Sequence, residues 1–197
     1  MRMLRLMPAL ALLTFGAPVA AEVTAVSETG FVIRLEAETP ASKTDAWRAL
    51  IAPGKWWSSA HTYSGDAANL YLDAQASGCF CEKLPKPAGE PADQRMGSVE
   101  HMHVVYADPP QGVLRMKGGL GPLQGESVNG TLTITVRPTP QGSKINWEYV
   151  VGGYTRIKNE DLAPAVNGVL NEQLTRLAAL LIPPATGAAE QAPGKPD

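Results

Sequence analysis

The stretch that decides the fold is Asp161–Leu181, DLAPAVNGVLNEQLTRLAALL, near the C-terminal end of this 197-residue chain. Its apolar side chains recur every three or four residues, which places them on one face of an α-helix. Gln173 falls at the edge of that face. Burial of such side chains contributes about 1.5–3 kcal/mol each, so this helix must cover another apolar surface. The apolar face consists of Leu162, Val166, Val169, Leu170, Leu174, Leu177, Leu180 and Leu181.

The covered surface is predicted to be an antiparallel sheet. Residues 31–37 alternate between apolar and polar side chains, as in a strand with one buried face. Ser42 and Asp45 then form a capping pair for a short amphipathic helix that ends near Ile51. Short breaks rich in Gly, Pro and Asp separate the later segments, which favours a meander of neighbouring strands. These strands are predicted at residues 70–74, 79–84, 98–107, 113–117, 130–137 and 144–151.

The N-terminal residues have the pattern of a secretory signal peptide. Arg2 and Arg5 precede an apolar run, and the small residues of Val19-Ala20-Ala21 precede Glu22. We therefore predict cleavage after Ala21 and a periplasmic or secreted mature protein. No later segment approaches the about 20 apolar residues that a transmembrane helix needs.

The rest of the chain is predicted to form one domain over residues 22–182, followed by a disordered Pro/Ala/Gly-rich tail over residues 183–197. Cleavage would leave 15 of the 17 basic residues against 19 acidic ones, a net charge of about −4. This balance argues against nucleic acid as a partner.

The order strand, helix, meander, long helix resembles the helix-grip fold of the START and SRPBCC superfamily. Trp56-Trp57 after the first helix and the Asp108-Pro109-Pro110 break contribute to this resemblance. In more detail, GCFCE (78–82), SVEH (98–101), GGLGPLQG (118–125) and VVGGY (150–154) resemble exported bacterial SRPBCC proteins that have no agreed activity. The resemblance implies an α+β fold in which a curved antiparallel sheet wraps around the C-terminal helix and leaves a cavity for a hydrophobic ligand. By the same resemblance, the cavity candidates are Trp56, Trp57, Met116, Trp147, Tyr149 and Gln173, although such residues also fill cores without any ligand.

Two alternating pairs, Cys79/Cys81 and His101/His103, lie on consecutive predicted strands. Residues i and i+2 of a strand share a face, so each pair points one way. If residue 81 lies opposite 101 and residue 79 opposite 103, all four side chains converge. A register shifted by one residue would place the histidines and the cysteines on opposite faces.

Three interpretations of these pairs remain open. In the first, the four side chains bind tetrahedral Zn²⁺ or a copper ion. If only three of them bind, the open coordination position would activate a water, with Glu82 or Glu100 as proton acceptor. Both glutamates would, however, face away from the ligands in regular strands. A Cys79–Cys81 disulfide is the second interpretation; it requires the strand to pucker, and the bond would be reducible. In the third, the cysteines pack as small apolar residues, and Cys81, His101 and His103 line a ligand cavity without metal.

The sequence thus predicts an exported protein that binds a hydrophobic small molecule, with no cofactor expected apart from the zinc or copper of the first interpretation. The alternative is an enzyme of hydrolase or cyclase type that uses the Cys/His/Glu cluster. A third class, a protein-interaction module, predicts an exposed apolar patch and an empty interior. The glycines of residues 118–125 do not join a strand to a helix, so they are interpreted as a mobile loop and not as a phosphate-binding loop.

Overall fold

The computed structural model describes residues 19–91 and 93–183. One antiparallel sheet of eight strands has the order β1-β2-β8-β7-β6-β5-β4-β3. The strands are β1 (Val19–Ser27), β2 (Gly30–Thr39), β3 (Leu70–Leu72), β4 (Cys79–Leu84), β5 (Gly97–Asp108), β6 (Val113–Lys117), β7 (Ser127–Thr139) and β8 (Gly142–Tyr154). The helices are α1 (Lys43–Leu50) and α2 (Asn159–Leu180), with short 3₁₀ turns η1 (Pro53–Lys55), η2 (Ser59–His61), η3 (Ala67–Asn69) and η4 (Gly121–Gly125). The predicted α+β fold is confirmed.

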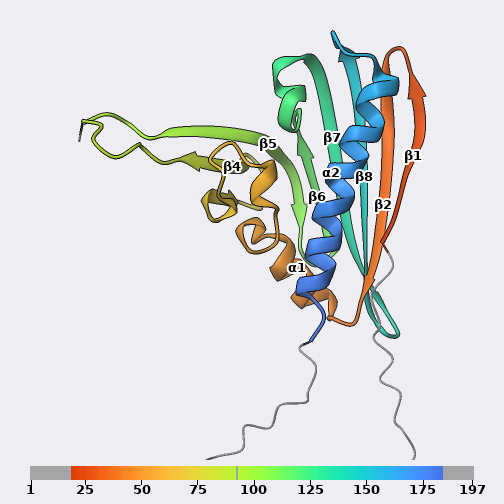
Figure 1. Ribbon diagram of the computed structural model, residues 1–197. Helices are drawn as coiled ribbons and strands as arrows, with labels where there is room; N and C mark the ends of the chain where they lie inside the picture. Colours follow the sequence, from red (N-terminus) through yellow and green to blue (C-terminus); the bar gives the residue numbers. More distant parts are fainter. Residues whose placement is uncertain (1–18, 92, 184–197) are drawn as a thin grey trace, which may run out of the picture.

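The long helix α2 lies across the sheet, as Figure 1 shows, and packs against β1 and β2. Leu170, Leu174 and Leu177 of its predicted apolar face are at most 1% exposed. Strands β3 to β8 follow one another as neighbours, which confirms the predicted meander, and β2 closes it by pairing with β8. The result is a curved sheet with a helix on its inner face, the helix-grip arrangement.

The short helix α1 begins where the sequence predicts. The Ser42 hydroxyl accepts a hydrogen bond from the Asp45 backbone N–H at 3.1 Å and donates to the Asp45 carboxylate at 2.7 Å. An N-cap of this kind is worth about 1 kcal/mol of helix stability.

The strand β1 was not predicted, and it overlaps the proposed cleavage site. Val19, Ala20 and Ala21 pair with Ala37, Glu36 and Leu35 of β2. Their small side chains have the pattern of a peptidase site, and the same side chains alternate as a strand does. The remainder of the predicted signal peptide (residues 1–18) lies outside the described residues, as does the predicted tail except for Pro183.

The interior between the sheet, α1 and the η1 turn is filled by side chains. Trp56, Met116 and Trp147 are 4%, 4% and 2% exposed, and the space between these residues and their neighbours is about 20 Å³. A space of this size holds one water molecule at most. Trp56, Met116 and Trp147, which the resemblance assigned to a ligand cavity, therefore belong to a packed core.

One part of the sheet departs from the compact body. The β4–β5 hairpin projects away from the other strands, and the 3₁₀ turns η1 to η3 lie beside its base (Figure 1). The candidate site lies where this hairpin, α2 and the η4 loop meet.

Candidate functional site

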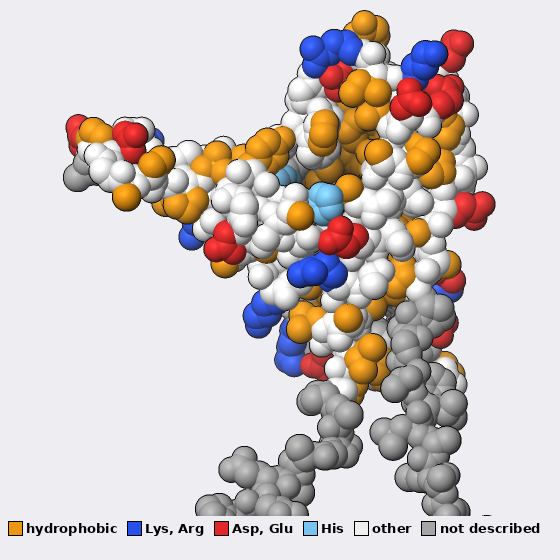
Figure 2. Space-filling model, in the orientation of Figure 1, with side chains coloured by type: hydrophobic (Ala, Val, Ile, Leu, Met, Phe, Trp, Pro, Cys, Tyr) orange, Lys and Arg blue, Asp and Glu red, His pale blue; other side chains and the backbone are white. Residues whose placement is uncertain are grey.

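A pocket of about 500 Å³ opens between α2, the η2 segment and the η4 loop. We call it the α2–η4 pocket. Figure 2 shows apolar side chains around a hollow on this face, with histidine beside it. Its size lies in the range of small-molecule sites, which are mostly apolar with a few polar groups. The lining consists of Trp57, His61, Thr62, Tyr63, His101, Leu120, Gly121, Pro122, Leu123, Leu162, Ala165, Val166, Val169 and Leu170.

A β-bulge turns His101 into this pocket. Cys79 lies opposite His103 and Phe80 opposite Met102, but Cys81 lies opposite Glu100, so His101 is the extra residue on β5. Both His101 and Met102 are consequently buried, at 4% and 1% exposed. The predicted pairing of 79 with 103 is confirmed, whereas the predicted pairing of 81 with 101 is wrong because of the bulge.

The two cysteines form a disulfide, which is the second of the three interpretations drawn from the sequence. Their Cα atoms are 5.4 Å apart, closer than the roughly 6.6 Å of two residues in an extended strand. The strand puckers at the position of the bulge, so the disulfide and the inward turn of His101 belong to the same local distortion.

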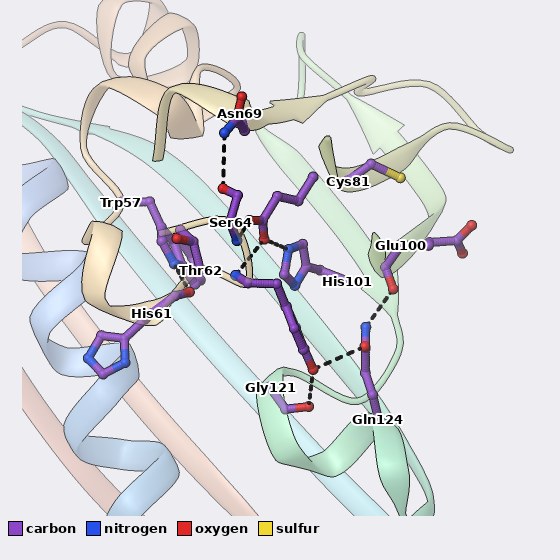
Figure 3. Close-up of polar contacts among 12 residues, drawn as sticks. Trp57, His61, Thr62, Ser64, Asn69, Cys81, Glu100, His101, Gly121 and Gln124 are labelled. Carbon is purple, nitrogen blue, oxygen red and sulfur yellow. Dashed lines mark hydrogen bonds and ion pairs between the residues drawn. The ribbon is translucent and has the colours of Figure 1, made fainter. Parts of the chain in front are cut away.

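The four predicted metal ligands do not converge. Cys79 and Cys81 are bonded to each other, and the Cys81 sulfur points away from the His101 imidazole in Figure 3. His103 is exposed, and its Nδ1 atom lies 3.4 Å from the Glu100 Oε1 atom on the surface. Within residues 19–91 and 93–183, no group of three or more Cys, His, Asp or Glu side chains has the geometry to hold a metal ion. These residues therefore do not fit zinc or copper.

The inward side of the bulge instead forms a His101–Glu82 pair. The His101 Nε2 atom lies 2.9 Å from the Glu82 Oε2 atom, and the Glu82 side chain is 0% exposed. The carboxylate also accepts hydrogen bonds from the backbone N–H groups of Tyr63 at 3.1 Å and Ser64 at 2.5 Å (Figure 3). Glu82 was expected to face away from the histidines, but it alternates with Cys81 and so points inward beside His101.

The surroundings of this pair fix its charge. Burial alone would raise the pKa of Glu82, but the hydrogen bonds from Ser64, Tyr63 and His101 outweigh it and lower the pKa below 4.5. Burial also lowers the pKa of His101 below 6.5, against the opposing effect of Glu82. At neutral pH the carboxylate is ionised and the imidazole is neutral. Because an ionised carboxylate only accepts, the imidazole proton lies on Nε2.

This pair predicts a loss of stability in mild acid. The unfolded chain binds more protons than the folded one when a folded-state pKa is lowered, so the free energy of unfolding decreases as pH decreases. The His101 contribution is lost from about pH 6.5 downward and the Glu82 contribution below about pH 4.5. Thermal unfolding followed by circular dichroism should show the melting temperature decreasing between pH 7 and pH 5. An unchanged melting temperature over this range would contradict the assigned charges.

Two aromatic rings pack against the imidazole. Phe80 stacks on His101 with ring centroids 4.9 Å apart, and the Tyr63 ring lies 5.8 Å away. Trp57 packs against Phe80 at 5.0 Å and uses its Nε1–H to donate to the His61 carbonyl. The Trp57 indole therefore presents an apolar surface to the pocket.

The η4 loop forms the opposite wall and is anchored by two tyrosines. The Tyr149 hydroxyl donates to the Gly118 carbonyl at 3.0 Å and accepts from the Leu120 N–H at 3.2 Å; its burial raises its pKa to about 12. The Tyr63 hydroxyl donates to the Gly121 carbonyl at 3.2 Å (Figure 3). Gly118, with φ 154°, has no room for a side chain, because a Cβ would lie 2.7 Å from the His101 carbonyl oxygen.

Of the residues that the sequence predicted to bind a ligand, Trp57 and His101 line the α2–η4 pocket. Tyr149 and Gln173 are fully buried and brace other segments, since Gln173 Oε1 accepts from the Ser58 N–H at 2.8 Å. The pocket residues Tyr63, Leu120 and Leu123 were not predicted. The α2 residues of the pocket were predicted to lie on the helix face that covers the sheet and not at a ligand site; they are Leu162, Val166, Val169 and Leu170.

Comparison with solved structures supports the fold. The solution structure of CalU16 from Micromonospora echinospora aligns with a TM-score of 0.52 at 13% identity, covering 94% of this chain and 81% of CalU16. MLL2253 from Mesorhizobium loti aligns with a TM-score of 0.51 at 17% identity, covering 76% of this chain and 96% of that one. SA2116 from Staphylococcus aureus, a protein of unknown function, aligns with a TM-score of 0.51 at 10% identity, covering 84% and 94%.

The eight-stranded sheet and the long C-terminal helix place the chain in the helix-grip class of α+β folds, and these similarities are consistent with that fold. At such identities they support the fold alone. No protein-family model and no curated protein matches the chain. No helix in the described part of the chain is both long and apolar enough to cross a membrane.

Proposed function

We propose that this protein is an exported, SRPBCC/START-like binding protein that holds a small, largely apolar molecule in the α2–η4 pocket. The observation that carries the proposal is the pocket itself, about 500 Å³ with leucine, valine and tryptophan in its lining. The pattern of the first 21 residues and the Cys79–Cys81 disulfide support export, because disulfides persist in oxidising compartments.

The test is to fill the pocket without disturbing the core. Ala165 lines the pocket and is exposed on α2, so Ala165→Trp adds bulk where a ligand would sit. A ligand excluded from the pocket loses about 2–3 kcal/mol of burial, which is roughly a 30- to 150-fold loss of affinity. The affinity for the neutral dye Nile red, measured by fluorescence titration, reports this change.

Ala179→Trp is the matched control, because Ala179 is an exposed alanine of α2 outside the pocket. Its affinity for Nile red should equal that of the unmodified protein. Equal affinities for the two tryptophan variants would refute the pocket as the binding site. Independently of the two variants, mass spectrometry of a solvent extract of the purified protein would identify the natural ligand.

The second candidate function is an enzyme of hydrolase or cyclase type in which His101 is a general base. The neutral imidazole backed by the ionised Glu82 favours it, because proton uptake would produce an ion pair at 2.9 Å. Cys79 and Cys81 have no part in such chemistry, since they are bonded to each other on the other side of β4. Turnover that is lost in His101→Ala while Nile red still binds would favour the enzyme over the binding protein.

A further inference from the structure

We infer that the α2–η4 pocket selects neutral apolar molecules that carry a hydroxyl group, with His101 Nδ1 as the acceptor of the hydroxyl proton. This inference rests on the proposed function and assigns the class of ligand. It follows from which imidazole nitrogen is free, what fixes the ring, and which charges surround it.

The free atom is Nδ1. The Nε2–H donates to Glu82, and Nδ1 has no hydrogen-bond partner among the described residues. The side-chain nitrogens and oxygens of the described residues that are fully buried and have no hydrogen-bond partner are Trp147 Nε1, Asn167 Oδ1, Asn171 Oδ1 and Gln173 Nε2. His101 Nδ1 is not one of these atoms, so it is not sealed from solvent. His101 lines the α2–η4 pocket, so we take its unused lone pair as the acceptor that this pocket offers to a ligand.

The ring cannot readily offer a donor instead. A 180° flip of the imidazole would put the Cε1 carbon in the place of Nε2 and remove the 2.9 Å hydrogen bond to Glu82. The carboxylate therefore keeps the proton on Nε2, and Nδ1 remains an acceptor. Stacking on Phe80, 4.9 Å between centroids, limits tilting. The pocket thus presents an oriented acceptor at a site where a hydrogen bond is stronger than in water.

The charges disfavour an anionic ligand such as a fatty acid. No Lys or Arg is among the described residues that line the pocket. The nearest fixed charge is the buried Glu82 carboxylate, bonded directly to the imidazole. A ligand carboxylate would face a lone pair with this negative charge behind it. His61 at the pocket is already paired with the Glu172 carboxylate, with His61 Nε2 lying 3.0 Å from Glu172 Oε2.

Three matched probes test the inference by isothermal titration calorimetry at pH 7.5. They are 2-naphthol, 2-methoxynaphthalene and 2-naphthoate, which share a ring system and differ in the polar group. We expect 2-naphthol to bind about tenfold more tightly than 2-methoxynaphthalene, the value of one buried hydrogen bond. We expect 2-naphthoate to bind more weakly than both. Equal affinities for the first two, or tightest binding of 2-naphthoate, would overturn the inference.

A second measurement uses the unmodified protein, since His101→Leu removes one of the hydrogen-bond donors to the buried Glu82 carboxylate and risks misfolding. In ¹⁵N NMR spectra of the histidine side chains, 2-naphthol should shift the His101 Nδ1 resonance and 2-methoxynaphthalene should leave it nearly unchanged. An Nδ1 resonance unmoved by saturating 2-naphthol would refute the inference.

The Ala165→Trp variant separates failure of the inference from failure of the proposed function. If that variant loses 2-naphthol and 2-methoxynaphthalene alike, and the two bind equally to the unmodified protein, the pocket is the site and only the hydroxyl preference is wrong. If Ala165→Trp changes the affinity for none of the probes, the proposed function fails and the inference with it.

Discussion

Glu82→Gln is expected to lower the free energy of unfolding by about 2–3 kcal/mol. The Glu82 carboxylate accepts hydrogen bonds from His101, Tyr63 and Ser64 while fully buried. A glutamine amide has one accepting oxygen, so its NH₂ group meets a donor and at least one buried donor is left unpaired. Urea unfolding followed by tryptophan fluorescence measures the loss, and the corresponding melting temperature should decrease by roughly 5–10 °C.

Glu100→Gln is the control for this substitution. Glu100 lies on the neighbouring strand with a side chain that is 55% exposed, and its ion pair with His103 is on the surface. A change at such a site is expected to stay within about 0.5 kcal/mol. If both variants lose the same small amount, the Glu82 carboxylate does not organise the segment around residues 63 and 64, and the orientation argued for His101 loses its support.

The sequence indicated the fold because its strongest periodic signals survive into the structure. The alternation within β7 and β8 depends on local spacing, and the buried faces of these strands follow it. The apolar face of residues 161–181 is buried at Leu170, Leu174 and Leu177, whereas Leu180 is 47% exposed. The Ser42 cap is local in the same way. Strand β1 was missed because Val19-Ala20-Ala21 satisfies two patterns at once, a peptidase site and an edge strand.

The candidate site was only partly predictable, because it depends on a bulge. The spacing His101-x-His103 indicates one shared face, and the extra residue in β5 places His101 inside and leaves His103 exposed. No periodicity encodes that insertion; it arises from how β4, puckered by its disulfide, pairs with β5. The pocket wall from η4 likewise depends on contacts of Tyr63 and Tyr149 that lie far from it in sequence.

Trp147→Ala is expected to cost about 4 kcal/mol of folding free energy, the largest effect among these variants. Trp147 is 2% exposed and its ring packs against Trp56 with centroids 6.0 Å apart, next to a space of only about 20 Å³. Removal of a large side chain from such a core costs its transfer free energy and that of the void left behind. Trp147→Phe keeps a ring and discards the buried Nε1–H that has no partner among the described residues, so it should lose much less.

The size of this loss distinguishes a packed core from a ligand cavity. Tyr154→Ala is the control on the same strand, since Tyr154 is 71% exposed and its removal should change stability by about 0.5 kcal/mol or less. A side chain that borders an empty cavity already lacks contacts on one side, so its truncation costs little. A loss below about 1 kcal/mol for Trp147→Ala in urea unfolding would therefore move the binding site back under the sheet. A loss near 4 kcal/mol leaves the α2–η4 pocket as the place for a ligand, because the interior around Trp147 is then already occupied by the protein itself.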